Sequence, residues 1–215
     1  RSNMNLDFSR SNHFVLGYNQ YLGEIAVIKL EGYYQYLDKI PVHRYVSSFN
    51  IINEGSNLAP VDESDLVNNG TGQNYGIDLT VERYLNEGFY FLITGSLFDS
   101  KYKGSDRIER NTTFNSNYVL NLLGGKEWKL NERGDVLALN VRFTTTGGRY
   151  FTHLNLTASQ ATGDAVEDTQ RAFSERQTPY LRLDVKLAYR IEFKNSSLEI
   201  ALDLQNATNN QNIFR

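Results

Sequence analysis

The fold of this chain is decided by residues 179–205, which read PYLRLDVKLAYRIEFK-NSS-LEIALDLQ. Apolar side chains alternate with polar ones from Leu181 to Phe193, and the alternation resumes at Leu198 after a short turn. Successive side chains on a strand point to opposite faces, so each run has one apolar and one charged face. The first run spans about thirteen residues, more than the five or six of a typical globular strand. Such a hairpin is typical of a membrane barrel, whose strands need roughly nine to eleven residues to cross.

The same pattern divides the chain into four hairpins. Three further pairs of alternating runs cover residues 14–36, 75–97 and 118–144, with turns at 22–24, 86–88 and 131–134. The long polar connections lie at 38–74, 101–117 and 146–178. We therefore predict an all-β fold, an antiparallel up-and-down meander of about eight long strands. Short turns at one end and long loops at the other favour part of a transmembrane β-barrel. No helical period of useful length is present.

The composition excludes several classes of protein. The 215 residues include no Cys, so disulfide scaffolds and Cys-ligated metal sites are excluded. The net charge of −3 and the pI near 5.7 argue against nucleic acid as a partner. Mean hydropathy is −0.48, but alternation hides a lipid-facing surface from such an average. The chain begins in mid-pattern at Arg1, and we expect it to be a mature fragment or a piece of a longer protein.

Aromatic residues lie near both ends of the expected strands, as in the aromatic belts of membrane barrels. Aromatics are also common in strands generally, so the alternative reading stays open. The residues near the short turns are Tyr21, Tyr84, Phe89, Trp128 and Phe193, and those near the long loops are Tyr36, Phe98, Tyr118, Tyr150 and Tyr180.

Several motifs resemble the carboxy-terminal barrel strands of TonB-dependent outer-membrane receptors. The likeness covers nearly the whole chain and is closest to Bacteroidetes-type receptors that carry a carboxypeptidase-regulatory-like module. The motifs are FVLGY (14–18), GYYQYLDKIPV (32–42), NYGIDL (74–79), TGSLFDSKY (94–102), GSD (104–106), YLRLD (180–184) and DLQNATN (203–209).

The resemblance implies a protein larger than this chain. Residues 1–215 would form a carboxy-terminal segment of a barrel of about twenty-two strands, without the plug domain and the final strands. Its implied partners are outer-membrane lipid, the plug, the remaining strands, and TonB through an amino-terminal segment absent here. Its implied function is energy-coupled uptake of a scarce ligand, such as a siderophore or an oligosaccharide, across the bacterial outer membrane.

Two groups of residues are candidates for functional contacts. Recognition concentrates in loops held by a rigid scaffold, so the aromatic, basic and histidine residues of the long loops are candidates for ligand contact. These are Tyr45, Phe49, Tyr102, Arg107, Arg110, Tyr150, His153 and Arg171. The charged row of the last hairpin would line a wet lumen, or else form an ordinary solvated sheet face. It contains Arg182, Asp184, Lys186, Arg190, Glu192, Glu199 and Asp203.

Catalytic and metal motifs are missing from the sequence. The three histidines, His13, His43 and His153, are scattered without ligand spacing, so we expect no metal site and no cofactor. Asp62, Glu63 and Asp65 lack EF-hand spacing and are interpreted as a solvated acidic loop. No Gly-x-Ser-x-Gly elbow is present, and we predict that the chain is not an enzyme.

Two other classes of protein remain open at this point. One is a self-contained small outer-membrane barrel that acts as an adhesin or an enzyme. The other is a soluble carbohydrate-binding β-sandwich, in which the apolar face packs against a second sheet. A sandwich would bury the apolar rows against a second sheet of the same molecule, whereas both kinds of membrane barrel would leave them exposed to lipid.

Overall fold

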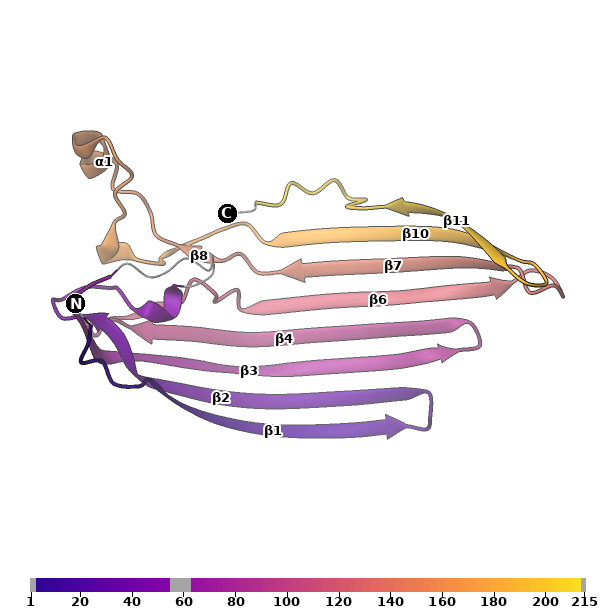
Figure 1. Cartoon of the computed structure of the whole chain (residues 1–215), viewed down its shortest axis with the longest axis horizontal. Coiled ribbons are helices and arrows are strands. Elements are labelled where there is room, and N and C mark those ends of the chain that lie inside the picture. Colours follow the sequence, from indigo (N-terminus) through magenta and orange to yellow (C-terminus); the bar gives the residue numbers. More distant parts are fainter. Residues whose placement is uncertain (1–2, 55–62, 214–215) are drawn as a thin grey trace.

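A computed structural model describes residues 3–54 and 63–213 of the chain, which form mainly β-structure (Figure 1). The long strands are β1 (Arg10–Leu22), β2 (Ala26–His43), β3 (Leu66–Asn86), β4 (Phe89–Lys103), β6 (Tyr118–Lys129), β7 (Val136–Thr146), β10 (Tyr180–Glu192) and β11 (Ser197–Leu204). The connections contain the short strands β5 (Glu109–Asn111), β8 (Tyr150–Phe151) and β9 (Glu175–Arg176). They also contain the helix α1 (Leu156–Thr162) and the 3-10 turns η1 (Ile51–Asn53) and η2 (Thr169–Arg171).

The long strands form one antiparallel sheet in the order β1-β2-β3-β4-β6-β7-β10-β11. Each long strand pairs with the long strands before and after it along the chain, so the predicted up-and-down meander is confirmed. The sheet is open in the described part of the chain, where β1 and β11 form its two edges and do not pair with each other. Positive φ angles at Gly23 (63°) and Gly88 (71°) make the tight turns at one end, a conformation that glycine adopts without steric cost.

The structure differs from the sequence-based prediction in the boundaries of two strands and in the presence of one helix. The predicted loop 38–74 is wrong at both ends, because β2 continues to His43 and β3 begins at Leu66. Register shifts after Leu37 and Ile40 interrupt the alternation there, so the period of two could not be read. The helix α1 was not predicted; the Asn155 side chain caps its start and Gly163, with φ of 79°, ends it.

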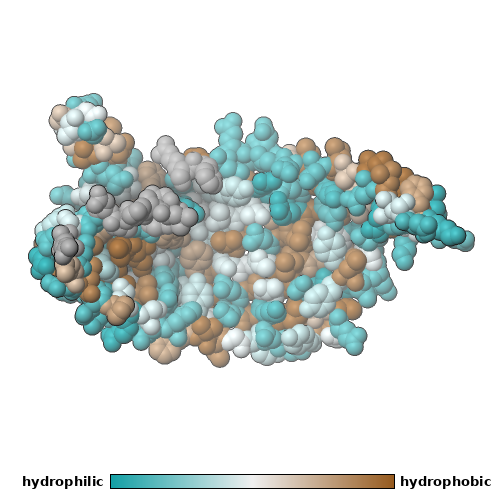
Figure 2. All heavy atoms as spheres, viewed as in Figure 1, coloured by the Kyte–Doolittle hydropathy of each residue, from teal (hydrophilic) through white to brown (hydrophobic). Residues whose placement is uncertain are grey.

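The sheet has one apolar face and one polar face. In one row across the apolar face, Leu16, Gly32, Ile77, Leu97 and Tyr118 are successive register partners from β1 to β6. Most large side chains of this face are exposed. Figure 2 shows the molecule from the opposite side, where the loops lie over the sheet and hydrophilic and hydrophobic residues are mixed. The exposed residues of the apolar face include Phe14, Leu16, Tyr18, Leu30, Tyr34, Tyr36, Tyr75, Ile77, Leu79, Leu97, Leu122, Trp128, Val141, Leu187, Leu198, Ile200, Leu202 and Leu204. The apolar face therefore lies open, with no second layer on it among the described residues.

The aromatic residues divide between the two faces. Tyr36 and Tyr118 lie on the apolar face towards the loops, and Phe89 and Trp128 lie on it towards the turns. Register places Tyr21, Phe98 and Tyr180 on the polar face instead, so the predicted belts are only partly formed on the apolar face. None of the helices among the described residues is long and apolar enough to span a membrane.

Burial is concentrated where the long loops meet the polar face of the sheet. Ile52 of η1 lies over β3, where a Cβ atom added at Gly72 would be 2.9 Å from the Ile52 Cδ1 atom. The Asn50 side chain, 1% exposed, donates to the Lys103 carbonyl at 2.9 Å and joins the first loop to β4. The rings of Tyr102 and Phe173 meet edge to face at 5.9 Å, which attaches the third loop. The three long connections therefore dock together over one end of the polar face.

Candidate functional site

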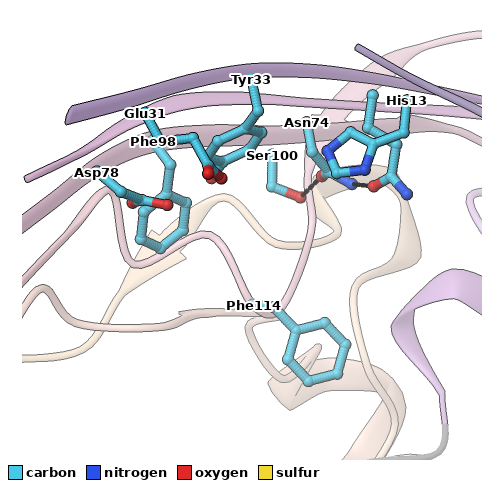
Figure 3. A pocket seen from close by; sticks show the side chains of 9 residues that line it. His13, Glu31, Tyr33, Asn74, Asp78, Phe98, Ser100 and Phe114 are labelled. Carbon is cyan, nitrogen blue, oxygen red and sulfur yellow. Dashed lines mark hydrogen bonds between the residues drawn. The ribbon is translucent and has the colours of Figure 1, made fainter. Parts of the chain in front are cut away.

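A hollow of about 400 Å³ lies between the polar face of β1–β4 and the loop that follows β5 (Figure 3). The strands contribute carboxylates, amides and rings, and the loop contributes one phenyl ring, that of Phe114. The lining residues are His13, Glu31, Tyr33, Gln35, Asn74, Asp78, Phe98, Ser100 and Phe114. Because the strand residues share the face that carries the ionic residues of β10, the hollow opens onto the polar side of the sheet.

A glycine makes room for the two aromatic rings of this hollow. Tyr33, Gly76 and Phe98 are register partners across β2, β3 and β4. A Cβ atom at Gly76 would lie 2.8 Å from both the Tyr33 hydroxyl and the Phe98 Cβ atom, and 2.7 Å from the Leu97 carbonyl oxygen. The absence of a side chain at Gly76 thus allows Tyr33 and Phe98 to approach each other over β3.

Hydrogen bonds hold in place both the strand residues that line the hollow and the loop that carries Phe114. Asn74 donates to the Gln35 side-chain oxygen at 2.8 Å, and the Ser100 hydroxyl donates to the Asn74 oxygen at 2.5 Å. The Thr112 hydroxyl continues the chain by donating to Ser100 at 2.8 Å. Asn115, which is fully buried, donates to Asp99 at 2.6 Å. The loop that carries Phe114 is therefore held on both sides of that ring.

The electrostatic character of the hollow is acidic. Glu31 and Asp78 are direct register partners on β2 and β3, an arrangement of like charges that costs stability in a sheet. Neither carboxylate forms an ion pair within residues 3–54 and 63–213. Carboxylates and amides beside aromatic rings can bind polar or cationic groups, because the ring face attracts positive charge. The hollow is therefore suited to bind a polar or cationic group.

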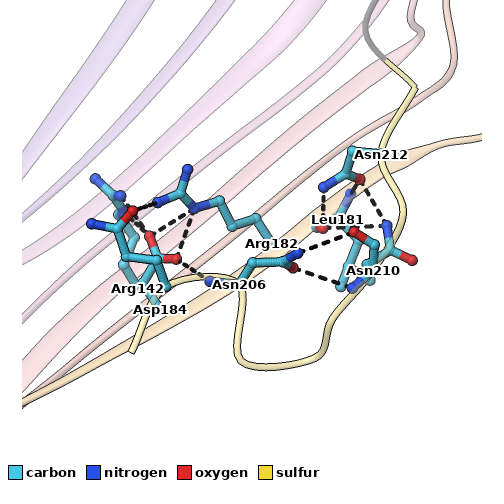
Figure 4. A network of polar contacts seen from close by, with 8 residues as sticks. Arg142, Leu181, Arg182, Asp184, Asn206, Asn210 and Asn212 are labelled. Carbon is cyan, nitrogen blue, oxygen red and sulfur yellow. Dashed lines mark hydrogen bonds and ion pairs between the residues drawn. The ribbon is translucent and has the colours of Figure 1, made fainter. Parts of the chain in front are cut away.

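A second polar region joins β7, β10 and the chain after β11 (Figure 4). The Asp184 carboxylate, 7% exposed, accepts from Arg182 Nε at 2.7 Å and from Arg142 Nε at 3.1 Å. It also accepts from the backbone N–H of Asn206 at 2.8 Å. A neighbouring hollow of about 210 Å³ is lined by Arg142, Asp184, Lys186 and Asp203, among others. Asp184 thus connects two strands and the carboxy-terminal segment.

The seven charged residues predicted to line a lumen share one face of the sheet, as their alternation requires. Beyond the Asp184 pairs, Lys186 binds Glu199 across β10 and β11 at 3.0 Å, and Arg190 lies 2.8 Å from Glu192. Asp203, the register partner of Lys186, is exposed and forms no ion pair among the described residues. Six of the seven residues thus take part in ion pairs on this face.

The predicted ligand-contact residues occupy different positions in the loops. The rings of Tyr45 and Phe49 both stack on the buried ring of His43, with centroids 4.5 and 4.3 Å from it. Tyr102 is 1% exposed, and Arg110 is paired with Asp106 at 2.7 Å, with 7% of the arginine side chain exposed. Tyr102 contacts Phe173 of the third loop and Arg110 pairs within its own loop, so both side chains are buried rather than presented to the exterior.

The remaining predicted contact residues are more accessible. Arg107 is exposed and adopts a positive φ of 59°. Tyr150 lies under the Arg176 guanidinium at 5.6 Å, and His153 is exposed 6.3 Å from the Phe151 ring. Arg171 is exposed and reaches Glu175 at 3.7 Å. Tyr45, Arg107, His153 and Arg171 are therefore the members of the predicted set best placed to meet an external molecule.

Sequence reasoning missed the hollow beneath Phe114. Alternation alone places Glu31 and Tyr33 on one face, but it does not say which residues of β3 and β4 lie beside them. That information is the strand register, which also brings Asn74, Asp78 and Ser100 to the hollow. Phe114 lies in a loop without any period, and no sequence signal indicated its position.

At the opposite end of the sheet, Asp135 anchors the turn between β6 and β7. Its carboxylate is fully buried and accepts from the Arg133 Nε atom at 3.0 Å and the Asn131 amide at 2.9 Å. The backbone N–H of Glu192 donates to the same carboxylate at 2.9 Å and brings in the neighbouring hairpin. The hydrogen bonds from Arg133, Asn131 and Glu192 hold the pKa of Asp135 well below its usual range.

The residues of the acidic loop are engaged separately. Glu63 lies 2.9 Å from the His43 ring, Asp65 accepts from Arg44 at 2.8 Å, and Asp62 lies outside the described residues. Over residues 3–54 and 63–213, no group of three or more His, Asp or Glu side chains is arranged to hold a metal ion.

In comparisons with known proteins, no family model matches this chain, and no curated protein is similar to it at a significant level.

Proposed function

We propose that this chain is a segment of a TonB-dependent receptor barrel in the bacterial outer membrane, and that it takes part in import without enzymatic activity. The observation that carries the proposal is the open apolar face of a sheet whose opposite face holds ion pairs. On β11 the adjacent side chains of Ile200 and Ala201 are both exposed, one on each face. If water lay on both sides of the sheet, the apolar face would be hydrated at a cost in free energy. Lipid against the apolar face and water against the polar face would suit both faces.

The two ends of the sheet support the same proposal. Tight turns join the strands at one end, and the long loops fold over the polar face at the other. Outer-membrane barrels have short periplasmic turns and longer extracellular loops. In this orientation the exposed loop residues face the exterior, and the hollow beneath Phe114 opens towards the barrel interior.

The motif resemblance supports the receptor assignment within membrane barrels. It brings the plug domain, the remaining strands and TonB as partners, together with the transport of a scarce ligand such as a siderophore or an oligosaccharide. The plug and the other strands would complete the enclosure that β1 and β11 leave open.

The two alternative functions account for less of the structure. A soluble sandwich requires a second layer on the apolar face, and the described residues place none there. A self-contained eight-stranded barrel requires β1 to pair with β11, whereas these strands form the two edges of the sheet.

Two matched substitutions on β11 test the membrane location. Ile200, 61% exposed, and the exposed Ala201 are neighbours on opposite faces, and each is replaced by arginine in the longest open reading frame that contains this chain. Ile200→Arg should reduce assembly in the outer membrane, with a cost of about 2–4 kcal/mol near mid-depth. Ala201→Arg should assemble normally beside Glu199 and Asp203. Equal assembly of both variants would remove the basis of the membrane assignment, because in water both positions tolerate arginine.

Energy coupling is tested separately from location. Cells that express this reading frame are compared with and without TonB for the uptake of candidate iron chelates and oligosaccharides. We expect uptake that requires both the protein and TonB. Uptake that persists without TonB, from a protein correctly placed in the outer membrane, would favour a passive pore instead.

A further inference from the structure

The edge of β10 extends beyond the strand that pairs with it. Pairing with β11 begins at Val185 and runs to Glu192, whereas pairing with β7 extends over the whole of 180–190. Residues 180–184 therefore have a strand on one side only among the described residues. Backbone groups on such an edge can pair with strands of other molecules, a hazard that natural sheets suppress by covering or interrupting the edge.

The segment 206–212 covers this edge with side-chain amides (Figure 4). The backbone N–H of Leu181 donates to the Asn212 Oδ1 atom at 2.9 Å, and the Asn212 Nδ2 atom donates to the Leu181 carbonyl at 2.9 Å. One amide side chain thus supplies the acceptor and the donor that a neighbouring antiparallel strand would supply from its backbone. The backbone N–H of Ala207 also donates to the Leu183 carbonyl at 2.7 Å.

The segment is held in this position by its own contacts. Asn206 and Asn209 adopt left-handed φ angles of 49° and 51°, which asparagine tolerates better than most residues. The Asn206 side chain donates to the Asn210 carbonyl at 3.1 Å, and the Asn210 side chain donates to Asn212 Oδ1 at 2.7 Å. Asp184 fixes the beginning of the segment through the Asn206 N–H. The amides are therefore oriented before any partner arrives.

We propose that residues 206–212 form an edge cap, which keeps other strands off Leu181 and Leu183 and confines further pairing to β11, Ser197–Leu204. The outer edge of β11, which the segment 206–212 leaves uncovered, can pair with an extended antiparallel segment of about eight residues. The strand that the cap excludes in solution is the exposed edge strand β1 of a second copy of this chain. The proposal does not rest on the transport function, because the same contacts would cap a sheet in water or in lipid.

Hydrogen exchange of the folded chain tests the cap. Asn212→Ala removes both Asn212 bonds to Leu181, and we expect the exchange of the Leu181 amide to rise by about tenfold. The control is Gln211→Ala, since no hydrogen bond of the Gln211 side chain is present in the described part of the chain. Unchanged protection in β6 shows that the fold of each variant is intact. Asn210→Ala, which removes one bond to Leu181 and one to Asn212, is the milder variant to use if Asn212→Ala does not fold.

Self-association is measured on the same samples by light scattering over a range of protein concentrations. If the cap excludes other strands, Asn212→Ala should raise the fraction of dimers and larger species above that of the parent chain and of Gln211→Ala. Faster Leu181 exchange without increased association would show a local contact with no protective role. Unchanged Leu181 exchange would contradict the proposal at its first step.

Discussion

Arg142 on β7 and Asp184 on β10 are register partners, and the Arg142 Nη2 atom lies 2.5 Å from the Asp184 Oδ2 atom. Asp184 also binds Arg182 and the Asn206 N–H, so this carboxylate carries several of the polar contacts that join two strands and the edge cap. A carboxylate surrounded in this way loses several charge-assisted bonds at once when it is neutralised.

Asp184→Asn should therefore destabilise the folded chain by about 1–3 kcal/mol, since hydrogen bonds to charged groups contribute about that much. The measurement is the denaturant midpoint of unfolding. The matched control is Asp203→Asn, because Asp203 lies on the same face, is exposed and forms no ion pair among the described residues. A loss of stability in the control equal to that in Asp184→Asn would assign the effect to the net charge of the face.

The lowered pKa of Asp135, in the turn between β6 and β7, predicts that folding stability depends on pH. Its folded pKa is lowered, so the stability that it contributes is present above the ordinary Asp pKa of about 3.9 and is lost as pH falls below it. Asp135→Asn should lower stability near pH 6 and reduce the difference in stability between pH 6 and pH 3. Glu132→Gln, an exposed position in the same turn, is the control. A variant with the same pH profile as the parent chain would exclude Asp135 as a source of that dependence.

Gly76 and Gly32 provide a matched pair of glycines in adjacent strands. Gly76→Ala should cost about 1–3 kcal/mol, because the added Cβ atom meets the rigid Leu97 carbonyl oxygen at 2.7 Å. Gly32→Ala meets nothing within 4 Å and should leave stability nearly unchanged. Thermal unfolding of both variants checks the difference. Similar midpoints would mean that β3 and β4 can separate enough to admit a methyl group.

The absence of cysteine from the sequence makes site-specific labelling direct. Leu79→Cys and Thr80→Cys place a fluorophore on opposite faces of β3, an interior strand of the sheet. In membranes that contain brominated lipids, we expect strong quenching at position 79 and weak quenching at position 80. A water-soluble quencher should show the opposite order. Equal quenching by lipid at the two positions would contradict the assigned orientation of the faces.

The sequence predicted the hairpins well, because a period of two records which face each residue occupies. The runs Leu181–Phe193 and Leu198–Gln205 fall on β10 and β11 with their ionic residues on one face. The extensions of β2 and β3 were missed, since Asn68–Asn74 carries polar side chains on both faces. Backbone pairing and the docked loops hold that region, and neither leaves a hydrophobic period in the sequence.

The residues that could contact a ligand were less predictable, because their positions depend on loop docking and strand register. Tyr102 and Arg110 were chosen by residue type, but the docking of three loops buries them. The hollow beneath Phe114 depends on strand register and on the space above Gly76, which act between residues far apart in the sequence. Information of that kind is not contained in the alternation of a single strand.

The pairing of each long strand only with its neighbours along the chain has an evolutionary consequence. A hairpin can be gained or lost between two others without breaking any pairing elsewhere in the sheet. The diameter of a barrel grows roughly in proportion to its number of strands. In the barrel that we propose, a lineage that duplicates or deletes such hairpins could therefore change the barrel width in steps of two strands, while the loops over each hairpin diverge independently.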